Sequence, residues 1–141
     1  MDIMRKNYFT LIQVKLPEII LKWSAIYQVY SINNKTGGKM IKELTNENFE
    51  DAVKTGVTVV DFWAPWCGPC KMIHPIVEEL SNDMDDVEFA KLNIDEAQQV
   101  AMKYQVMSIP TLIVFKNGSP QETIIGVTPK EKIKKKIQNV V

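Results

Sequence analysis

The sequence is poor in the residues that bind metal ions or cross-link a small fold through disulfides: its 141 residues include two cysteines and one histidine. A closed zinc site is tetrahedral, so Cys67, Cys70 and His74 would have to recruit carboxylates or a second chain. A single C-x-x-C bridge closes too short a loop to constrain the unfolded chain appreciably. We therefore expect neither a metal centre nor a structural disulfide framework, and the value of the two thiols is chemical.

Excess charge and long apolar runs are also missing. Lys and Arg balance Asp and Glu at 17 each, and this zero net charge gives no basis for nucleic-acid binding. The apolar stretch 9–32 is interrupted by Lys15, Glu18 and Lys22, whereas a membrane-spanning helix needs about 20 mostly apolar residues. The stretch is also a poor secretory signal, because no small-residue cleavage site follows it. We therefore expect a cytoplasmic protein whose core domain does not associate with membranes.

Charge is unevenly distributed along the chain. Residues 1–39 carry six Lys or Arg against two Asp or Glu, and residues 40–141 carry eleven against fifteen. The polar, glycine-containing stretch 31–39 has the composition of a linker. We therefore predict an N-terminal extension over 1–39, disordered or loosely helical, and one domain over 40–141. A membrane-surface segment is the less favoured alternative for the extension.

The codons behind Gly37-Gly38-Lys39-Met40 suggest a further explanation for the extension. Two glycine codons can spell a GGAGG-like ribosome-binding sequence just ahead of an ATG. Under this hypothesis Met40 is the biological start, and residues 1–39 are translated upstream sequence that is not part of the native product. Peptides from before Met40 in protein made from the native locus would contradict it.

From Met40 onward, strand and helix patterns alternate. Residues 57–63 are apolar on both faces, as expected of a central strand that is covered on each side. Thr128 as N-cap, Pro129 and Glu131 form a capping-box pattern for the last helix. The predicted strands are 41–44, 57–63, 87–94, 111–115 and 121–125, with a hairpin turn at 117–118. The first predicted helix follows residues 45–48, and the second runs from near Cys67 to Met84 with a kink at Pro75. The third spans 96–104, and the last follows residue 128. The sum is an α/β sandwich of three layers, a mixed central sheet flanked by helices on both faces.

Both cysteines lie in one seven-residue stretch, Ala-Pro-Trp-Cys-Gly-Pro-Cys at 64–70, between a strand pattern and a helix pattern. A thiol at a helix N-terminus meets the positive end of the helix dipole and unpaired N–H groups, which favour the thiolate. The thiolate is the form that attacks a disulfide sulfur. The stretch therefore predicts a redox site. Two buried structural cysteines have little support, because Trp-Cys-Gly-Pro-Cys is not a core pattern.

The segment 60–72, Val-Asp-Phe-Trp-Ala-Pro-Trp-Cys-Gly-Pro-Cys-Lys-Met, resembles the active-site segment of the bacterial thioredoxin family. Three further segments match the family in the same order: 91–95, 108–111 and 115–118. The resemblance covers Met40 to the C-terminus and implies a thioredoxin-like fold and the reduction of protein disulfides. Cys67, the more exposed thiol, would attack the client protein, and the deeper Cys70 would resolve the mixed disulfide.

The resemblance also implies tuning and client-binding roles. Gly68 and Pro69, between the two sulfurs, resemble the strongly reducing members of the superfamily. Pro110 matches the family's cis-proline, which faces the disulfide and leaves the preceding backbone free to pair with an extended client. An apolar groove around Cys67 would then be formed by Trp66, Ser108, Ile109, Pro110, Gly126 and Val127.

Asp61 and His74 are the candidate proton acceptors. Asp61 has apolar neighbours on its own strand face, so we predict a buried carboxyl with a raised pKa that takes the Cys70 proton, directly or through one water. Lys91 matches the family lysine near this aspartate, although an exposed strand lysine fits the spacing equally well. His74 departs from the small residue expected there. It follows Cys70 by four residues, so it is either a partly exposed histidine or a second proton acceptor near Cys70.

The implied partners follow from what the chain cannot do alone. It has no G-x-G-x-x-G fingerprint, so we expect no cofactor of its own and only indirect use of NADPH. The resemblance implies a thioredoxin-reductase-type flavoprotein, disulfide-containing client proteins and a monomeric state. Two alternatives stay open: an exported disulfide oxidant or isomerase, and a non-catalytic thioredoxin-fold binding subunit. A reduction potential would separate the first from a reductase, and the effect of Cys67→Ser would test the second.

Overall fold

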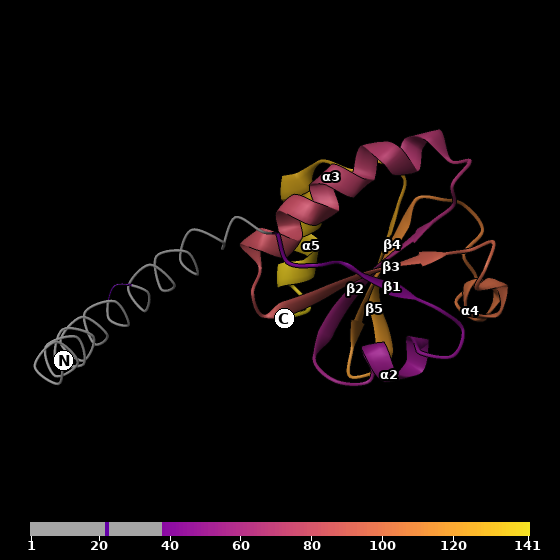
Figure 1. Cartoon of the computed structure of the whole chain (residues 1–141), viewed down its shortest axis with the longest axis horizontal. Coiled ribbons are helices and arrows are strands. Elements are labelled where there is room, and N and C mark those ends of the chain that lie inside the picture. The colour runs from indigo at the N-terminus through magenta and orange to yellow at the C-terminus, as the bar shows by residue number, and fades with distance from the viewer. Residues whose placement is uncertain (1–21, 23–37) are drawn as a thin grey trace, which may run out of the picture. The chain divides into compact units, whose positions relative to one another are not determined.

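The computed structural model describes Lys22 and residues 38–141. A five-stranded mixed sheet forms the centre of its Gly38–Val141 part (Figure 1). The spatial order of the strands is β1-β3-β2-β4-β5. The strands are β1 (Lys42–Leu44), β2 (Val57–Trp63), β3 (Val87–Asn93), β4 (Thr111–Lys116) and β5 (Ser119–Ile125). The helices are α2 (Phe49–Val53), α3 (Gly68–Asp83), α4 (Gln98–Lys103) and α5 (Lys130–Gln138).

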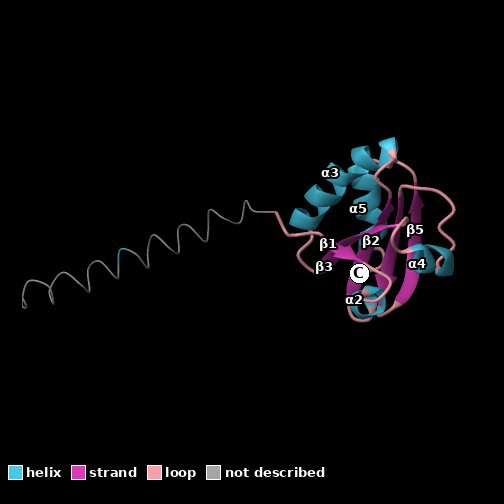
Figure 2. Ribbon diagram, turned by 45° about the vertical axis from the view of Figure 1, so that its right-hand side comes forward, coloured by secondary structure: helices cyan, strands magenta, loops and turns pink. Residues whose placement is uncertain are grey.

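The central strand β2 positions the residues of both core layers. It runs parallel to β3 and antiparallel to β4, and six of its seven residues are buried. Helices α3 and α5 lie on one face of the sheet, and α2 and α4 lie on the other (Figure 2). Because side chains alternate along a strand, Val59 and Asp61 face the layer of α3 and α5, whereas Val60 and Phe62 face the layer of α2 and α4. The predicted three-layer α/β sandwich with a mixed sheet is therefore confirmed.

Aromatic packing fixes the short helix α2 against the sheet. The Phe49 side chain is fully buried, and its ring centroid lies 6.5 Å from that of Phe62, 5.3 Å from that of Tyr104 and 5.4 Å from that of Phe115. A helix of five residues has too few internal hydrogen bonds to be stable alone. The burial of Phe49 therefore holds α2 in place and closes the end of this core layer.

Two local predictions have different outcomes. The hairpin between β4 and β5 is confirmed, and both turn residues, Asn117 and Gly118, have positive φ. The predicted capping box is wrong, because α5 begins at Lys130, and Pro129 occupies the N-cap position without a side-chain cap. The Thr128 hydroxyl donates instead to the Gly126 carbonyl oxygen at 3.3 Å, so it is turned toward the preceding loop.

The long helix α3 begins within the redox stretch 64–70. It continues without interruption from Gly68 to Asp83, so Pro75 inside it does not divide the helix. One face buries Ile73, Val77 and Leu80 against the sheet. Among the described residues, none of the helices combines the length and apolar character needed to cross a lipid bilayer.

Candidate active site

Cys67 and Cys70 form a disulfide at the N-terminus of α3, with their Cα atoms 5.4 Å apart. Cys67 is the N-cap residue in an extended conformation, and its sulfur accepts a hydrogen bond from the Cys70 amide at 3.2 Å. Both side chains are buried, with 4% of Cys67 and 0% of Cys70 exposed. Gly68 and Pro69 make the exposed first turn of the helix. A thiolate at Cys67 would therefore be stabilised by an amide hydrogen bond and by the helix dipole.

Asp61 is a buried carboxyl whose surroundings favour the protonated form. Its side chain is 1% exposed, and neither of its oxygens has a hydrogen-bond partner among the residues that the structure describes. Burial raises the pKa of Asp61 to about 7; the charge of Lys91 lowers that pKa, and Glu43 raises it. A carboxyl with this pKa can both accept and release a proton near neutral pH.

Lys91 lies next to Asp61 in the sheet but makes its ion pair elsewhere. The two residues are register partners between β2 and β3. The Lys91 ammonium lies 3.3 Å from a carboxylate oxygen of Glu43 on β1 and 5.3 Å from the centroid of the Trp63 ring. Sequence reasoning assigned no role to Glu43, because strand pairing and not spacing brings it beside Lys91.

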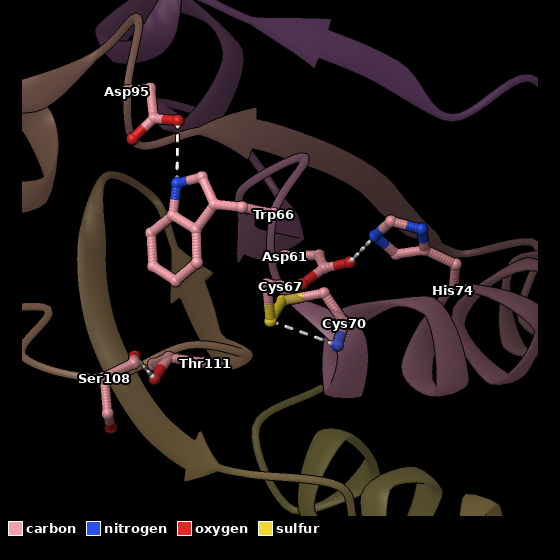
Figure 3. The surroundings of a disulfide bond; sticks show 8 residues. All are labelled: Asp61, Trp66, Cys67, Cys70, His74, Asp95, Ser108 and Thr111. Atoms are coloured by element: carbon pink, nitrogen blue, oxygen red, sulfur yellow. Dashed lines mark hydrogen bonds and ion pairs between the residues drawn. A yellow bond between two sulfur atoms is a disulfide. The ribbon is translucent and has the colours of Figure 1, made fainter.

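His74 contacts Asp61. The Nε2 atom of His74 lies 3.3 Å from Oδ2 of Asp61, and its side chain is 29% exposed (Figure 3). The His74 ring also meets Trp63 edge to face, with the centroids 5.4 Å apart. Desolvation and, to a smaller extent, the charge of Lys91 lower the pKa of His74, whereas Glu78 and Glu43 raise it. His74 is thus a partly exposed histidine that touches the carboxyl predicted to serve Cys70.

The residues of the predicted client groove after Trp66 come from the turn before β4 and the loop after β5. Ile109 packs against the cysteine pair, and the Ile109–Pro110 peptide bond is cis. The Gly126 amide donates to the Pro110 carbonyl oxygen at 2.8 Å, which brings the loop after β5 beside this turn. The Ser108 carbonyl oxygen accepts the Thr111 hydroxyl at 2.6 Å, and the Val127 side chain is exposed.

Trp66 forms the most exposed aromatic part of this rim. Its side chain is 67% exposed, and its indole N–H donates to Oδ2 of Asp95 at 3.0 Å (Figure 3). Asp95 was not predicted as a site residue. Asp95 comes just after β3, and Trp66 follows the parallel strand β2, so both lie at the same edge of the sheet. This shared edge was the sequence signal that could have paired them.

Comparison with known proteins identifies the family. The Thioredoxin family model matches residues 40–139. The chain belongs to the thioredoxin family. It is 50% identical over 99 residues to a thioredoxin of Staphylococcus saprophyticus, covering 70% of this chain and 95% of that protein. It is 51% identical over 94 residues to a thioredoxin of Staphylococcus haemolyticus, covering 66% of this chain and 90% of that protein.

Thioredoxin likeness extends to three dimensions. The crystal structure of the Malassezia sympodialis thioredoxin superposes with a TM-score of 0.66 at 36% identity and covers 70% of this chain and 91% of that chain. The buried cysteine pair at the start of α3 is the redox centre expected of this family. The protein is a thiol–disulfide oxidoreductase that acts on protein disulfides through Cys67 and Cys70.

Proposed function

We propose that Cys67 attacks the disulfide of a client protein and that Cys70 resolves the resulting intermediate. The Cys67 thiolate bonds to one client sulfur, and the other client sulfur leaves as a thiolate. Cys70 then loses its proton and attacks Cys67, which breaks the mixed disulfide and releases the second client thiolate. Two electrons pass to the client, and this protein ends with the Cys67–Cys70 disulfide. The position of Cys67 at the N-cap of α3 supports this assignment most directly.

Asp61 is the proton acceptor for Cys70 in this scheme. Its burial on the α3 side of β2 and its pKa of about 7 support the role, because such a carboxyl is ionised often enough to accept a proton at neutral pH. Lys91 tunes this pKa through its positive charge. Gly68 and Pro69, in the turn between the two sulfurs, help to set a strongly reducing potential for the cysteine pair.

Client proteins bind at the rim made by Trp66, Ser108, Ile109, Pro110, Gly126 and Val127. Exposed apolar surface at Trp66 and Val127 supports this location. Contacts of this kind recognise shape and extended backbone, which suits a broad range of clients. A thioredoxin-reductase-type flavoprotein restores the dithiol with electrons from NADPH, and the protein acts as a monomer in the cytoplasm.

Insulin reduction with an excess of thioredoxin reductase and NADPH tests the assignment of the cysteines. Cys67→Ser is expected to abolish turnover. Cys70→Ser is expected to stop after one attack and to leave the client covalently bound, as a mass shift that a small thiol reverses. The double serine variant is the matched control and should capture no client. Undiminished turnover by Cys67→Ser would contradict the proposed roles.

A measured reduction potential tests the direction of the reaction. Equilibration of the Cys67–Cys70 pair with a glutathione buffer should leave it more reducing than that buffer, as a cytoplasmic reductant requires. A pair more oxidising than glutathione would support the exported oxidant or isomerase instead. Client binding that survives in the double serine variant, without turnover in the unmodified protein, would support the binding subunit.

A further inference from the structure

Asp61 has an access to solvent that does not pass the cysteine pair. An open cavity of about 450 Å³ lies beside α3, and Asp61 contributes to its wall. The ionisable side chains in that wall are Lys39, Asp61, His74, Glu78 and Lys91. The Asp61 side chain is only 1% exposed, so its direct contact with water in the cavity is small.

His74 lies in the same cavity wall and contacts this carboxyl. One ring nitrogen, Nε2, lies 3.3 Å from Oδ2 of Asp61, and the second ring nitrogen faces away from the carboxyl (Figure 3). The His74 side chain is 29% exposed. Helical spacing places it on a similar side of α3 as Cys70. An imidazole in this position can take a proton at one nitrogen and lose one at the other.

Charged groups from several elements act on the protonation of this histidine. Desolvation and, to a smaller extent, the charge of Lys91 on β3 lower the pKa of His74, whereas Glu78 on α3 and Glu43 on β1 raise it. The Lys39 ammonium is held at the Val87 carbonyl oxygen and the Glu88 carboxylate, which limits its effect. Ionised Asp61, on β2, also favours a proton on the imidazole because the two groups are in contact. The net effect is a lowered pKa, so the neutral imidazole, which can accept a proton from Asp61, is favoured at neutral pH.

We infer that His74 is a positioning residue that carries protons between Asp61 and the solvent of this cavity. The inference rests on the proposed role of Asp61. At neutral pH part of Asp61 is protonated, and before resolution this carboxyl gives its proton to Nε2 of His74 while a proton on the opposite nitrogen leaves to water. The Cys70 thiol then gives its proton to the Asp61 carboxylate, and the Cys70 thiolate attacks the mixed disulfide and releases client. His74 stays neutral, one proton has reached solvent, and Asp61 holds the proton of Cys70.

The test is the pH dependence of client release in a single turnover. His74→Gln keeps a polar side chain of similar length but cannot titrate, and His74→Ala opens the site. Both variants should release client about tenfold more slowly near neutral pH, less than the roughly 100-fold or greater loss typical of removing a general base, since Asp61 remains. Their pH profiles should lose one ionisation. Asn82→Ala, in the same cavity wall, is the matched control and should keep the original rate and profile.

Chemical rescue separates proton transfer from a structural role. Millimolar imidazole should restore most of the rate of His74→Ala and leave the unmodified protein unaffected, because free imidazole can enter the cavity and carry the proton. Unchanged rates and profiles in both variants, or slow variants that imidazole does not rescue, would overturn the inference. Absence of turnover in the unmodified protein would instead contradict the proposed function itself.

Discussion

Replacing Asp61 by Asn should stabilise the protein strongly above neutral pH. The carboxyl has a pKa of about 7 when folded, against an ordinary value of 3.8. Between these values the folded state binds more protons at Asp61 than the unfolded state does, so the free energy of unfolding falls as pH rises. At about 1.36 kcal/mol per pKa unit, the accumulated cost is about 4 kcal/mol above pH ~7. An amide of the same shape does not ionise and avoids this cost.

Urea unfolding followed by circular dichroism, at several pH values with the disulfide intact, measures this effect. The variant and the unmodified protein should be equally stable below about pH 3, where Asp61 is mostly protonated in both states. The difference should then grow with pH and level off above pH 7.

The matched control is Asp86→Asn, which changes an exposed carboxyl in the turn before β3. Its effect on unfolding should stay within about 0.5 kcal/mol at every pH, as is usual for surface substitutions. A stability gain of Asp61→Asn that does not depend on pH would refute the reasoning, because it would come from packing and not from ionisation.

Three further substitutions test single features of the fold and site. Lys91→Met removes the charge that lowers the pKa of Asp61, so the carboxyl resonance of Asp61 in NMR should titrate at higher pH than in the unmodified protein. Phe49→Ala should lower the free energy of unfolding by about 3–5 kcal/mol in urea titrations, because the ring is fully buried among three aromatic neighbours. Gly126→Ala should cost about 1–2 kcal/mol in the same assay, since φ is 80° there but an added Cβ meets no atom within 4 Å.

Elements with a strong hydrophobic pattern could be predicted from the sequence. Residues 57–63 are apolar on both faces, and β2 has these bounds in the structure. The capping box at Thr128 could not be judged from sequence, because its hydroxyl bonds to Gly126 once the loop after β5 is folded. The first strand begins one residue later than predicted, at Lys42. Local bonding at element ends depends on neighbours that a short window of sequence does not contain.

The same limit applies to the site. The stretch 64–70 contains both cysteines and the helix start, so spacing alone predicts their juxtaposition. Contact between Asp61 and His74 depends on which face of β2 meets α3, and strand alternation combined with helical spacing could have indicated it. The ion pair of Lys91 with Glu43 requires the parallel pairing of β1 with β3, which no local pattern specifies.

The outer strands of the described sheet have a consequence for self-association. β1 has only three residues, and β5 carries Pro120, which lacks an amide proton, at a shift in register opposite Phe115. Short or proline-interrupted edges give a neighbouring molecule few backbone groups with which to extend the sheet. Edge-to-edge aggregation is thereby discouraged, and this domain can be concentrated without its sheet serving as a template for another copy.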